Sequence, residues 1–166
     1  MATQSISFSE TVTFGFTLAE IMIVLVIIGI LVAINLPMFF GSSARSRDAE
    51  RANDVATIAS ELERSYRATA ATAGPSYPPT NASTATTIAT IIGNNDSITA
   101  PKATSNSIIP AASASPQHPS GLQYIYQSFN AAGALCTAAP CVRFILYYYH
   151  ESHPAETRTL HSMRQQ

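Results

Sequence analysis

The stretch that decides the fold is residues 21–34, which read IMIVLVIIGILVAI. It contains no charged or polar side chain, and after Asn35 the chain stays largely apolar as far as residue 40. About twenty helical residues, each rising about 1.5 Å, cover the roughly 30 Å hydrocarbon core of a bilayer. The run therefore predicts a membrane-spanning helix.

A cleaved secretory signal is the alternative interpretation of this run. Such a signal carries basic residues before the apolar stretch and small residues after it. Residues 1–15 contain no Lys or Arg, whereas Gly41-Ser42-Ser43-Ala44 has the small residues of a cleavage site. The missing basic residues favour the spanning helix, and the signal stays as the alternative.

Glu20 is the one charged residue next to the apolar run, and Phe16 and Leu18 lie on its other side. An ionised carboxylate at this depth costs several kcal/mol unless it has a partner or reaches the headgroups. The sequence leaves both solutions open. Either Glu20 is solvated at the membrane surface, or it is placed to meet a positive charge.

The segment GFTLAE at residues 15–20, followed by the apolar run, resembles the processing site and anchor helix of type IV pilins and type II secretion pseudopilins. In that family a prepilin peptidase cuts after the glycine and methylates the new N-terminus. The resemblance implies a leader peptide of residues 1–15, a cut between Gly15 and Phe16, and N-methylation of Phe16. It also implies that Glu20 serves assembly by pairing with the N-terminal amine of a subunit.

Gly29 and Pro37 match positions where the helix of this family is weak. Glycine lowers helix propensity by about 1 kcal/mol relative to alanine, and proline removes a backbone donor and clashes with the preceding turn. We expect either a tolerated kink or a local unwinding between them. The charge pattern departs from the family: Arg45 and Arg47 follow the run, and the positive-inside rule opposes a cytoplasmic N-terminus. We keep the family's orientation because the cleavage motif is the more specific signal.

Residues 16–40 are thus expected to be a hydrophobic transmembrane and assembly helix, and residues 41–68 its amphipathic second half. In the second half, apolar side chains recur at three- and four-residue spacing. They are Ala52, Val55, Ile58, Leu62 and Tyr66. This stripe predicts packing on a C-terminal sheet. The arginines of the segment would suit DNA, but their interleaved acidic neighbours favour a solvated or salt-bridged face.

The rest of the chain predicts a small sheet domain. Residues 69–121 are rich in Ala, Thr, Ser and Pro, and read as a surface loop with a short helix over 85–92. Residues 122–129 and 142–149 are rich in β-branched and aromatic side chains, which predicts two strands of an antiparallel sheet within 122–150. The second strand is expected to be central, with the helix on one side. Residues 151–166 read as a polar, exposed tail. The expected fold class is α+β, with a long N-terminal helix packed on the sheet.

Cys136 and Cys141 enclose four residues in the connection between the predicted strands. Two thiols supply only half of a tetrahedral metal site. In an oxidising exterior a disulfide is the favoured pairing, worth about 2 kcal/mol for so short a loop. Pilins have a C-terminal disulfide loop of this kind, although a longer one. We expect no metal and no cofactor.

The sequence shows no nucleophile–base pair, phosphate loop or paired catalytic carboxylates, so we do not expect an enzyme, and the resemblance implies a structural subunit. The resemblance implies a helical homo-oligomeric filament, a type IV pilus serving adhesion, motility or DNA uptake. Its partners would be the prepilin peptidase and the inner-membrane pilus assembly machinery. The subunit would pass from the cytoplasmic membrane to an extracellular pilus. A minor pilin, a secretion pseudopilin and a membrane-tethered binding protein or enzyme are the alternatives.

Overall fold

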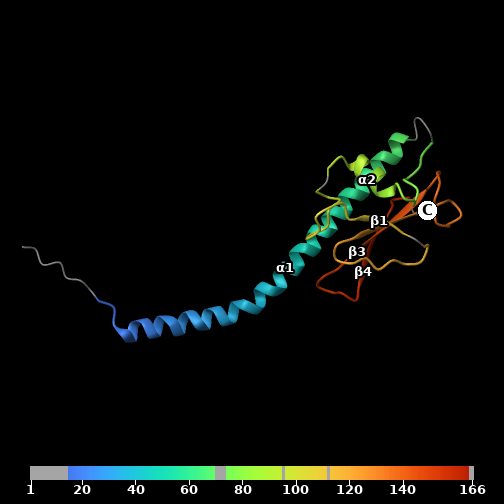
Figure 1. The fold of residues 1–166 in the computed structure, drawn as a ribbon. Coiled ribbons are helices and arrows are strands. Elements are labelled where there is room, and N and C mark those ends of the chain that lie inside the picture. Colours follow the sequence, from blue (N-terminus) through green and yellow to red (C-terminus); the bar gives the residue numbers. More distant parts are fainter. Residues whose placement is uncertain (1–14, 70–73, 95, 112, 165–166) are drawn as a thin grey trace, which may run out of the picture. The chain divides into compact units, whose positions relative to one another are not determined.

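The computed structural model describes residues 15–69, 74–94, 96–111 and 113–164, without the side chains of residues 35–40 and 67–69. Within these residues the chain forms two helices and four strands (Figure 1). They are α1 (Leu18–Thr69), α2 (Thr84–Ile92), β1 (Ile108–Pro110), β2 (Tyr124–Phe129), β3 (Arg143–Tyr149) and β4 (Thr157–His161). The chain divides into two compact units, residues 1–40 and residues 41–166.

The first unit contains the beginning of α1. The helix starts at Leu18, and its bounds include the backbone of Gly29 and Pro37. The predicted leader lies outside the described residues except for Gly15, as does the side chain of Pro37. Within the part of the chain that the structure describes, no helix is both long and apolar enough to cross a membrane.

The second unit contains a four-stranded mixed sheet with the strand order β1-β2-β3-β4. β2 and β4 both pair antiparallel to β3, which is therefore central, as predicted. The expectation of a purely antiparallel sheet is wrong, because β1 pairs parallel to β2, with Ile109 opposite Ile125. β1 is short and ends in Pro110, and proline is tolerated at a sheet edge because no ladder bond is needed there. Its short length and its proline explain why β1 was not predicted from the sequence.

The C-terminal segment is not a simple exposed tail, since it contains β4. Leu160 lies opposite Leu146 of β3 and is partly buried against the core. Ser162, just after the strand, is buried, and its backbone N–H donates to the carbonyl of Phe144. The sequence conceals this strand because Leu160 is its only large apolar residue. An edge strand with one solvated face needs no more.

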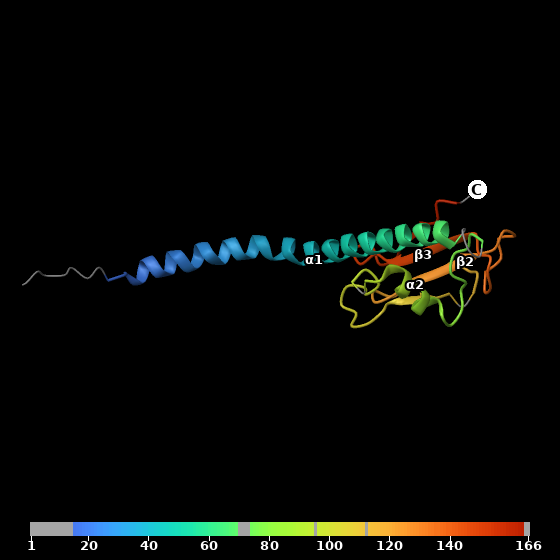
Figure 2. The ribbon, with the colours of Figure 1, turned by 90° about the horizontal axis from the view of Figure 1, so that it is seen from above.

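The amphipathic half of α1 packs on one face of this sheet through the predicted stripe. Figure 2 shows this half of α1 running alongside β2 and β3. Val55, Ile58, Leu62 and Tyr66 are buried in one core with residues from β2 and β3. The sheet residues of this core are Tyr124, Tyr126, Phe144 and Leu146. Ala52, predicted on the stripe, is exposed. A smaller cluster of Ala111, Ile125 and Tyr147 lies apart from this core.

The segment before β2 contributes more to the core than a surface loop would. α2 confirms the predicted short helix, with Ile88 fully buried, and Gly93 closes it with a φ of 66°. That left-handed conformation favours glycine. Ile98, Ala100 and Ile108 are also buried in the main core. The fold is therefore α+β, with both α1 and α2 contributing to the main core.

The disulfide between Cys136 and Cys141 is present, as predicted. Both cysteines are buried. Two residues of the segment 77–80 donate backbone hydrogen bonds to the carbonyls of the cysteines. The N–H of Tyr77 donates to the carbonyl of Cys141 over 2.9 Å, and the N–H of Thr80 donates to that of Cys136 over 2.7 Å. The disulfide loop thus fastens residues 77–80 to the sheet.

Candidate functional site

The predicted cleavage site is open to solvent. Gly15 is exposed, Phe16 is 84% exposed, and neither residue belongs to a helix or strand. A Cβ atom added at Gly15 would meet nothing within 4 Å. Exposed, irregular backbone is where proteases cut most readily. The peptide bond between Gly15 and Phe16 is therefore accessible.

Glu20 caps the N-terminus of α1 together with Thr17. The backbone N–H and the Oγ1 hydroxyl of Thr17 both donate to Oε2 of Glu20 over 2.8 Å. In return, the N–H of Glu20 donates to Oγ1 of Thr17 over 3.2 Å. This reciprocal pattern is a capping box. Sequence reasoning missed the role of Thr17, although the spacing T-x-x-E signals it.

The capping box leaves part of the Glu20 carboxylate available. Both bonds from Thr17 end on Oε2, and a carboxylate accepts through two oxygens with about four lone-pair sites. No described residue donates a hydrogen bond to Oε1 of Glu20. The side chain can therefore cap its own helix and accept a further donor at the same time.

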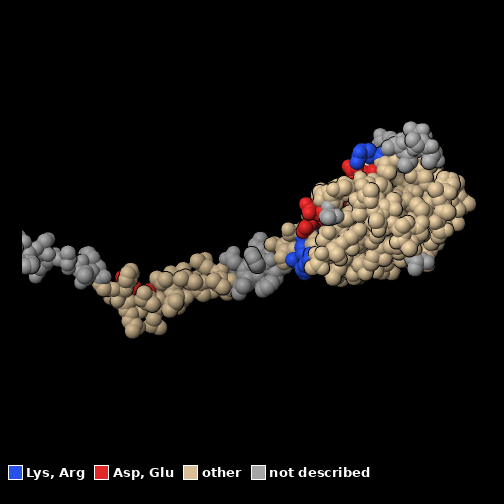
Figure 3. All heavy atoms as spheres, turned by 45° about the horizontal axis from the view of Figure 1, so that its top comes forward, with Lys and Arg blue, Asp and Glu red and all other residues tan. Residues whose placement is uncertain are grey.

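Residues 21–34 present an apolar surface on every side of the helix. Their large apolar side chains are exposed by amounts between 48% at Ile21 and 68% at Ile34. Figure 3 shows no blue surface of Lys or Arg over the described part of this segment. A helix that is apolar all round is normally buried in protein or lipid. Removal of this surface from water would therefore be favourable.

In the second unit, Asp48 joins the turn between β3 and β4 to α1. Its Oδ1 accepts the N–H of Glu151 over 2.6 Å. Its Oδ2 accepts the N–H and the hydroxyl of Ser152 over 2.9 and 2.6 Å. Asp48 is buried, and Nη1 of Arg51 donates to its Oδ1 over 3.1 Å. We call Asp48, Arg51, Glu151 and Arg47 the docking cluster.

Glu151 completes the docking cluster from the side of the turn. Nε of Arg47 donates to its Oε2 over 2.8 Å, and Nη2 of Arg51 donates to the same oxygen over 3.3 Å. Nη2 of Arg51 also reaches the carbonyl of Gly121 over 3.2 Å. Arg51 is only 1% exposed. Burial of this charge is tolerated because two carboxylates and a carbonyl surround it.

The docking cluster keeps both of its carboxylates ionised. Burial alone would raise the pKa of Asp48, but the hydrogen bonds from Ser152 and from the N–H of Glu151 outweigh it and hold the pKa at about 2. The hydrogen bond from Arg47 is the main cause that lowers the pKa of Glu151, also to about 2. Protonation of either carboxyl therefore destabilises the packing of the β3–β4 turn against α1.

Two further carboxylates of α1 bind the sheet domain. The hydroxyl of Tyr124 donates to Oδ2 of Asp54 over 2.6 Å, and burial raises the pKa of Asp54. Oε1 of Glu63 accepts the hydroxyl of Tyr77 over 2.8 Å and the N–H of Met163 over 2.9 Å. From the sequence, we expect the acidic residues of this segment on a solvated or salt-bridged face. The structure instead uses them to fix α1 on the sheet.

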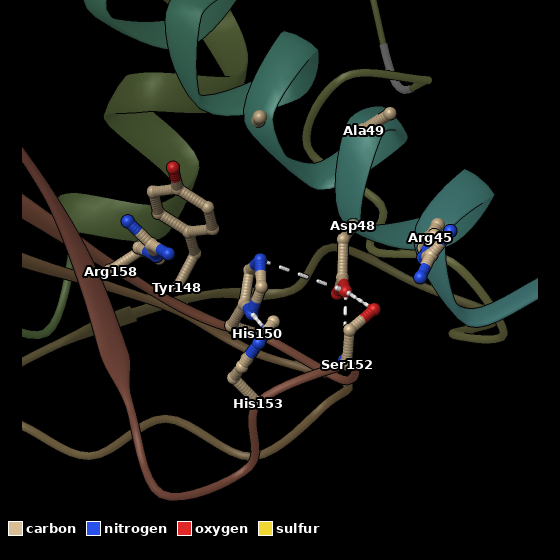
Figure 4. A pocket seen from close by; sticks show the side chains of 9 residues that line it. Arg45, Asp48, Ala49, Tyr148, His150, Ser152, His153 and Arg158 are labelled. Carbon is tan, nitrogen blue, oxygen red and sulfur yellow. Dashed lines mark hydrogen bonds and ion pairs between the residues drawn. The ribbon is translucent and has the colours of Figure 1, made fainter. Parts of the chain in front are cut away.

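A pocket of about 370 Å³ opens beside the docking cluster, between α1 and β4 (Figure 4). Asp48, His150, Ser152 and His153 line it together with two cationic side chains, Arg45 and Arg158. Arg158 pairs with Glu156 over 3.2 Å. The described residues contain no group of three or more His, Cys, Asp or Glu side chains that would hold a metal ion.

The chain matches no protein-family model, no curated protein and no solved structure. The resemblance to pilins therefore depends on the residues of the N-terminal motif. The structure places two of these, Gly15 and Phe16, together in an exposed segment, and Glu20 follows at the first turn of α1.

Proposed function

We propose that this chain is the structural subunit of a type IV pilus-like filament, processed between Gly15 and Phe16 and assembled through its N-terminal helix. The observation that carries the proposal is the apolar surface of residues 21–34, exposed on every side of α1. Surface of this kind contributes about 25 cal/mol per Å² when it is removed from water. Packing many copies of this helix side by side removes the apolar surface from water.

Register in such a bundle comes from Glu20. After the cut, Phe16 carries a free amine, and the Oε1 atom of Glu20 is available to accept it. An unpaired carboxylate among apolar helices is costly, and a partner of opposite charge removes most of that cost. A subunit seated one turn away would leave both charges unpaired, so the pair selects one register more than it adds affinity.

Before assembly, the same helix resides in the cytoplasmic membrane. Apart from Thr17, Glu20 and Asn35, residues 16–40 are apolar and extend beyond the described side chains, and 25 residues at about 1.5 Å each exceed the roughly 30 Å of hydrocarbon. The sheet domain then lies outside the membrane, where its disulfide is stable. When the subunit leaves the membrane and enters the filament, helices of neighbouring subunits replace lipid around the apolar surface of residues 21–34.

The variant Gly15→Val tests processing apart from folding. A side chain at Gly15 meets open space, so the fold tolerates it. We expect the variant to keep its precursor mass, to stay in the membrane fraction and to yield at least about tenfold fewer sheared filaments. Immunoblotting of membrane and sheared fractions measures both quantities.

Gly41→Ala is the matched control, since a Cβ at Gly41 also meets nothing within 4 Å. It lies far from the cut in the sequence and should be processed normally. Normal processing and filament yield in Gly15→Val would refute the proposed function. So would a wild-type chain that stays in the membrane and never enters a polymer, which is the behaviour of a tethered enzyme or binding protein.

A further inference from the structure

Two imidazoles meet at the turn between β3 and β4. The Nδ1 atoms of His150 and His153 are 3.1 Å apart, and their ring centroids are 4.9 Å apart. The backbone sets this pairing. The N–H of His153 donates to the carbonyl of His150 over 3.2 Å, and the N–H of Glu156 donates to that of His153 over 2.9 Å. These bonds fix the backbone of the turn that carries both rings.

We propose that His150 and His153 chelate one divalent transition-metal cation through their Nδ1 atoms. Imidazole nitrogen binds Zn²⁺ at about 2.0–2.1 Å. Two nitrogens 3.1 Å apart, each at that distance from one ion, subtend about 98° at the ion. This angle lies between the square-planar arrangement of Cu²⁺ or Ni²⁺ and the tetrahedral arrangement of Zn²⁺.

Asp48 places a carboxylate near the first of the two rings. Nε2 of His150 lies 3.8 Å from Oδ2 of Asp48 (Figure 4). Asp48 is itself held by the N–H groups of Glu151 and Ser152. With its proton on Nε2, facing the carboxylate, His150 presents the lone pair of Nδ1 to His153. Histidine ligands of metals usually donate their other ring N–H to a carboxylate or carbonyl, and this carboxylate would have to approach by a few tenths of an ångström to accept it.

Coordination replaces the bond that joins the two rings in the absence of a cation. In that state a proton on one Nδ1 links the rings as an N–H···N hydrogen bond. On binding, His153 carries its proton on Nε2, and both Nδ1 lone pairs go to the ion. His153 is exposed, so that proton exchanges with water. No net proton and no electron is transferred.

The site supplies two ligands from the described residues, and water takes the other positions. His150 and His153 both line the pocket of about 370 Å³, which has room for these waters. Two imidazoles favour Cu²⁺, Ni²⁺ and Zn²⁺ over the oxygen-preferring Ca²⁺ and Mg²⁺. The bound ion would brace the turn that carries Glu151. This inference stands whether or not the chain forms filaments.

Calorimetric titration of the untagged full-length chain in detergent micelles with ZnCl₂ tests the site. The chain has four histidines, so the two outside the pair serve as matched controls. We expect one Zn²⁺ per chain in the wild type, in His118→Ala and in His161→Ala. We expect loss of this binding in His153→Ala and in His150→Ala.

A second measurement separates lost binding from lost folding. Because His153 is exposed, His153→Ala should keep the wild-type circular dichroism. Zn²⁺ should raise the unfolding temperature of the wild type, since a ligand of the native state stabilises it, but not that of His153→Ala. With CuCl₂, electron paramagnetic resonance should show coupling to two nitrogens in the wild type. Wild-type affinity in folded His153→Ala, equal loss in His118→Ala, or no stoichiometric binding at all would each overturn the proposal.

Discussion

Cells that make Glu20→Ala should process the precursor normally and yield at least about tenfold fewer filaments. The substitution leaves the amine of Phe16 without its carboxylate among apolar helices. Removing one partner of a buried ion pair costs about 3–5 kcal/mol, and each 1.4 kcal/mol is about tenfold in an equilibrium. Electron microscopy and immunoblots of sheared fractions measure the yield, and the mass of the membrane-bound chain measures processing.

The capping box makes it necessary to separate the charge of Glu20 from its hydrogen bonds. Glu20→Gln keeps an acceptor for Thr17 and removes the charge, so we expect it to assemble as poorly as Glu20→Ala. Thr17→Val removes the hydroxyl of the cap and keeps the charge. It should weaken the helix end by about 1 kcal/mol and still assemble. Abundant filaments from Glu20→Gln would mean that the cap, not the charge, is what assembly needs.

Asp48→Ala should destabilise the sheet domain by about 3–5 kcal/mol, because it removes one partner of a buried ion pair. The variant leaves Arg51 buried with one carboxylate fewer and leaves the N–H groups of Glu151 and Ser152 without their acceptor. Urea unfolding of the full-length chain in mild detergent measures the loss. All seven tyrosines lie from Tyr66 onward, so near-ultraviolet circular dichroism reports on this domain.

The control for Asp48→Ala is Glu50→Ala, which removes an exposed carboxylate two residues along the same helix. Exposed substitutions usually change stability by no more than about 0.5 kcal/mol. Equal stability of the two variants would show that the docking cluster contributes little to the fold.

The same cluster predicts how stability depends on pH. Asp48 and Glu151 have folded-state pKa values of about 2, below their ordinary values of 3.8 and 4.5. Their contribution is therefore complete above about pH 5 and is lost as the pH falls from there toward 2. Measured with EDTA present, the wild type should lose stability across this window, and Asp48→Ala should lose less. If the stability of the wild type and of Asp48→Ala fell in parallel over this pH range, the pH dependence could not be assigned to Asp48.

Local pattern was enough to predict much of the fold. Val55, Ile58 and Leu62 follow helical spacing and are buried, and Ile88 of the predicted short helix is buried as well. The aromatic residues of β3 alternate between the two faces of the sheet, with Phe144 in the main core and Tyr147 in the smaller cluster. In each case the signal lies within one element and depends only on apolar periodicity.

What the sequence concealed depends on partners distant in the chain. Asp48 and Arg51 look like ordinary solvated charges of a helix, and their ligand Glu151 follows about a hundred residues later. β4 carries one large apolar residue, Leu160, and β1 ends in Pro110, so neither gives a strand signal by itself. For Glu20 the sequence left solvation and ion pairing open. The structure adds the cap with Thr17, which is compatible with both.

The most direct test of the account is the mass and N-terminal sequence of the polypeptide in filaments sheared from cells. We expect residues 16–166 bearing one added methyl group, with the sequence starting at N-methylated Phe16. A polypeptide that keeps residues 1–15, or one that begins after Ala44 as a secretory signal would leave it, would contradict the account.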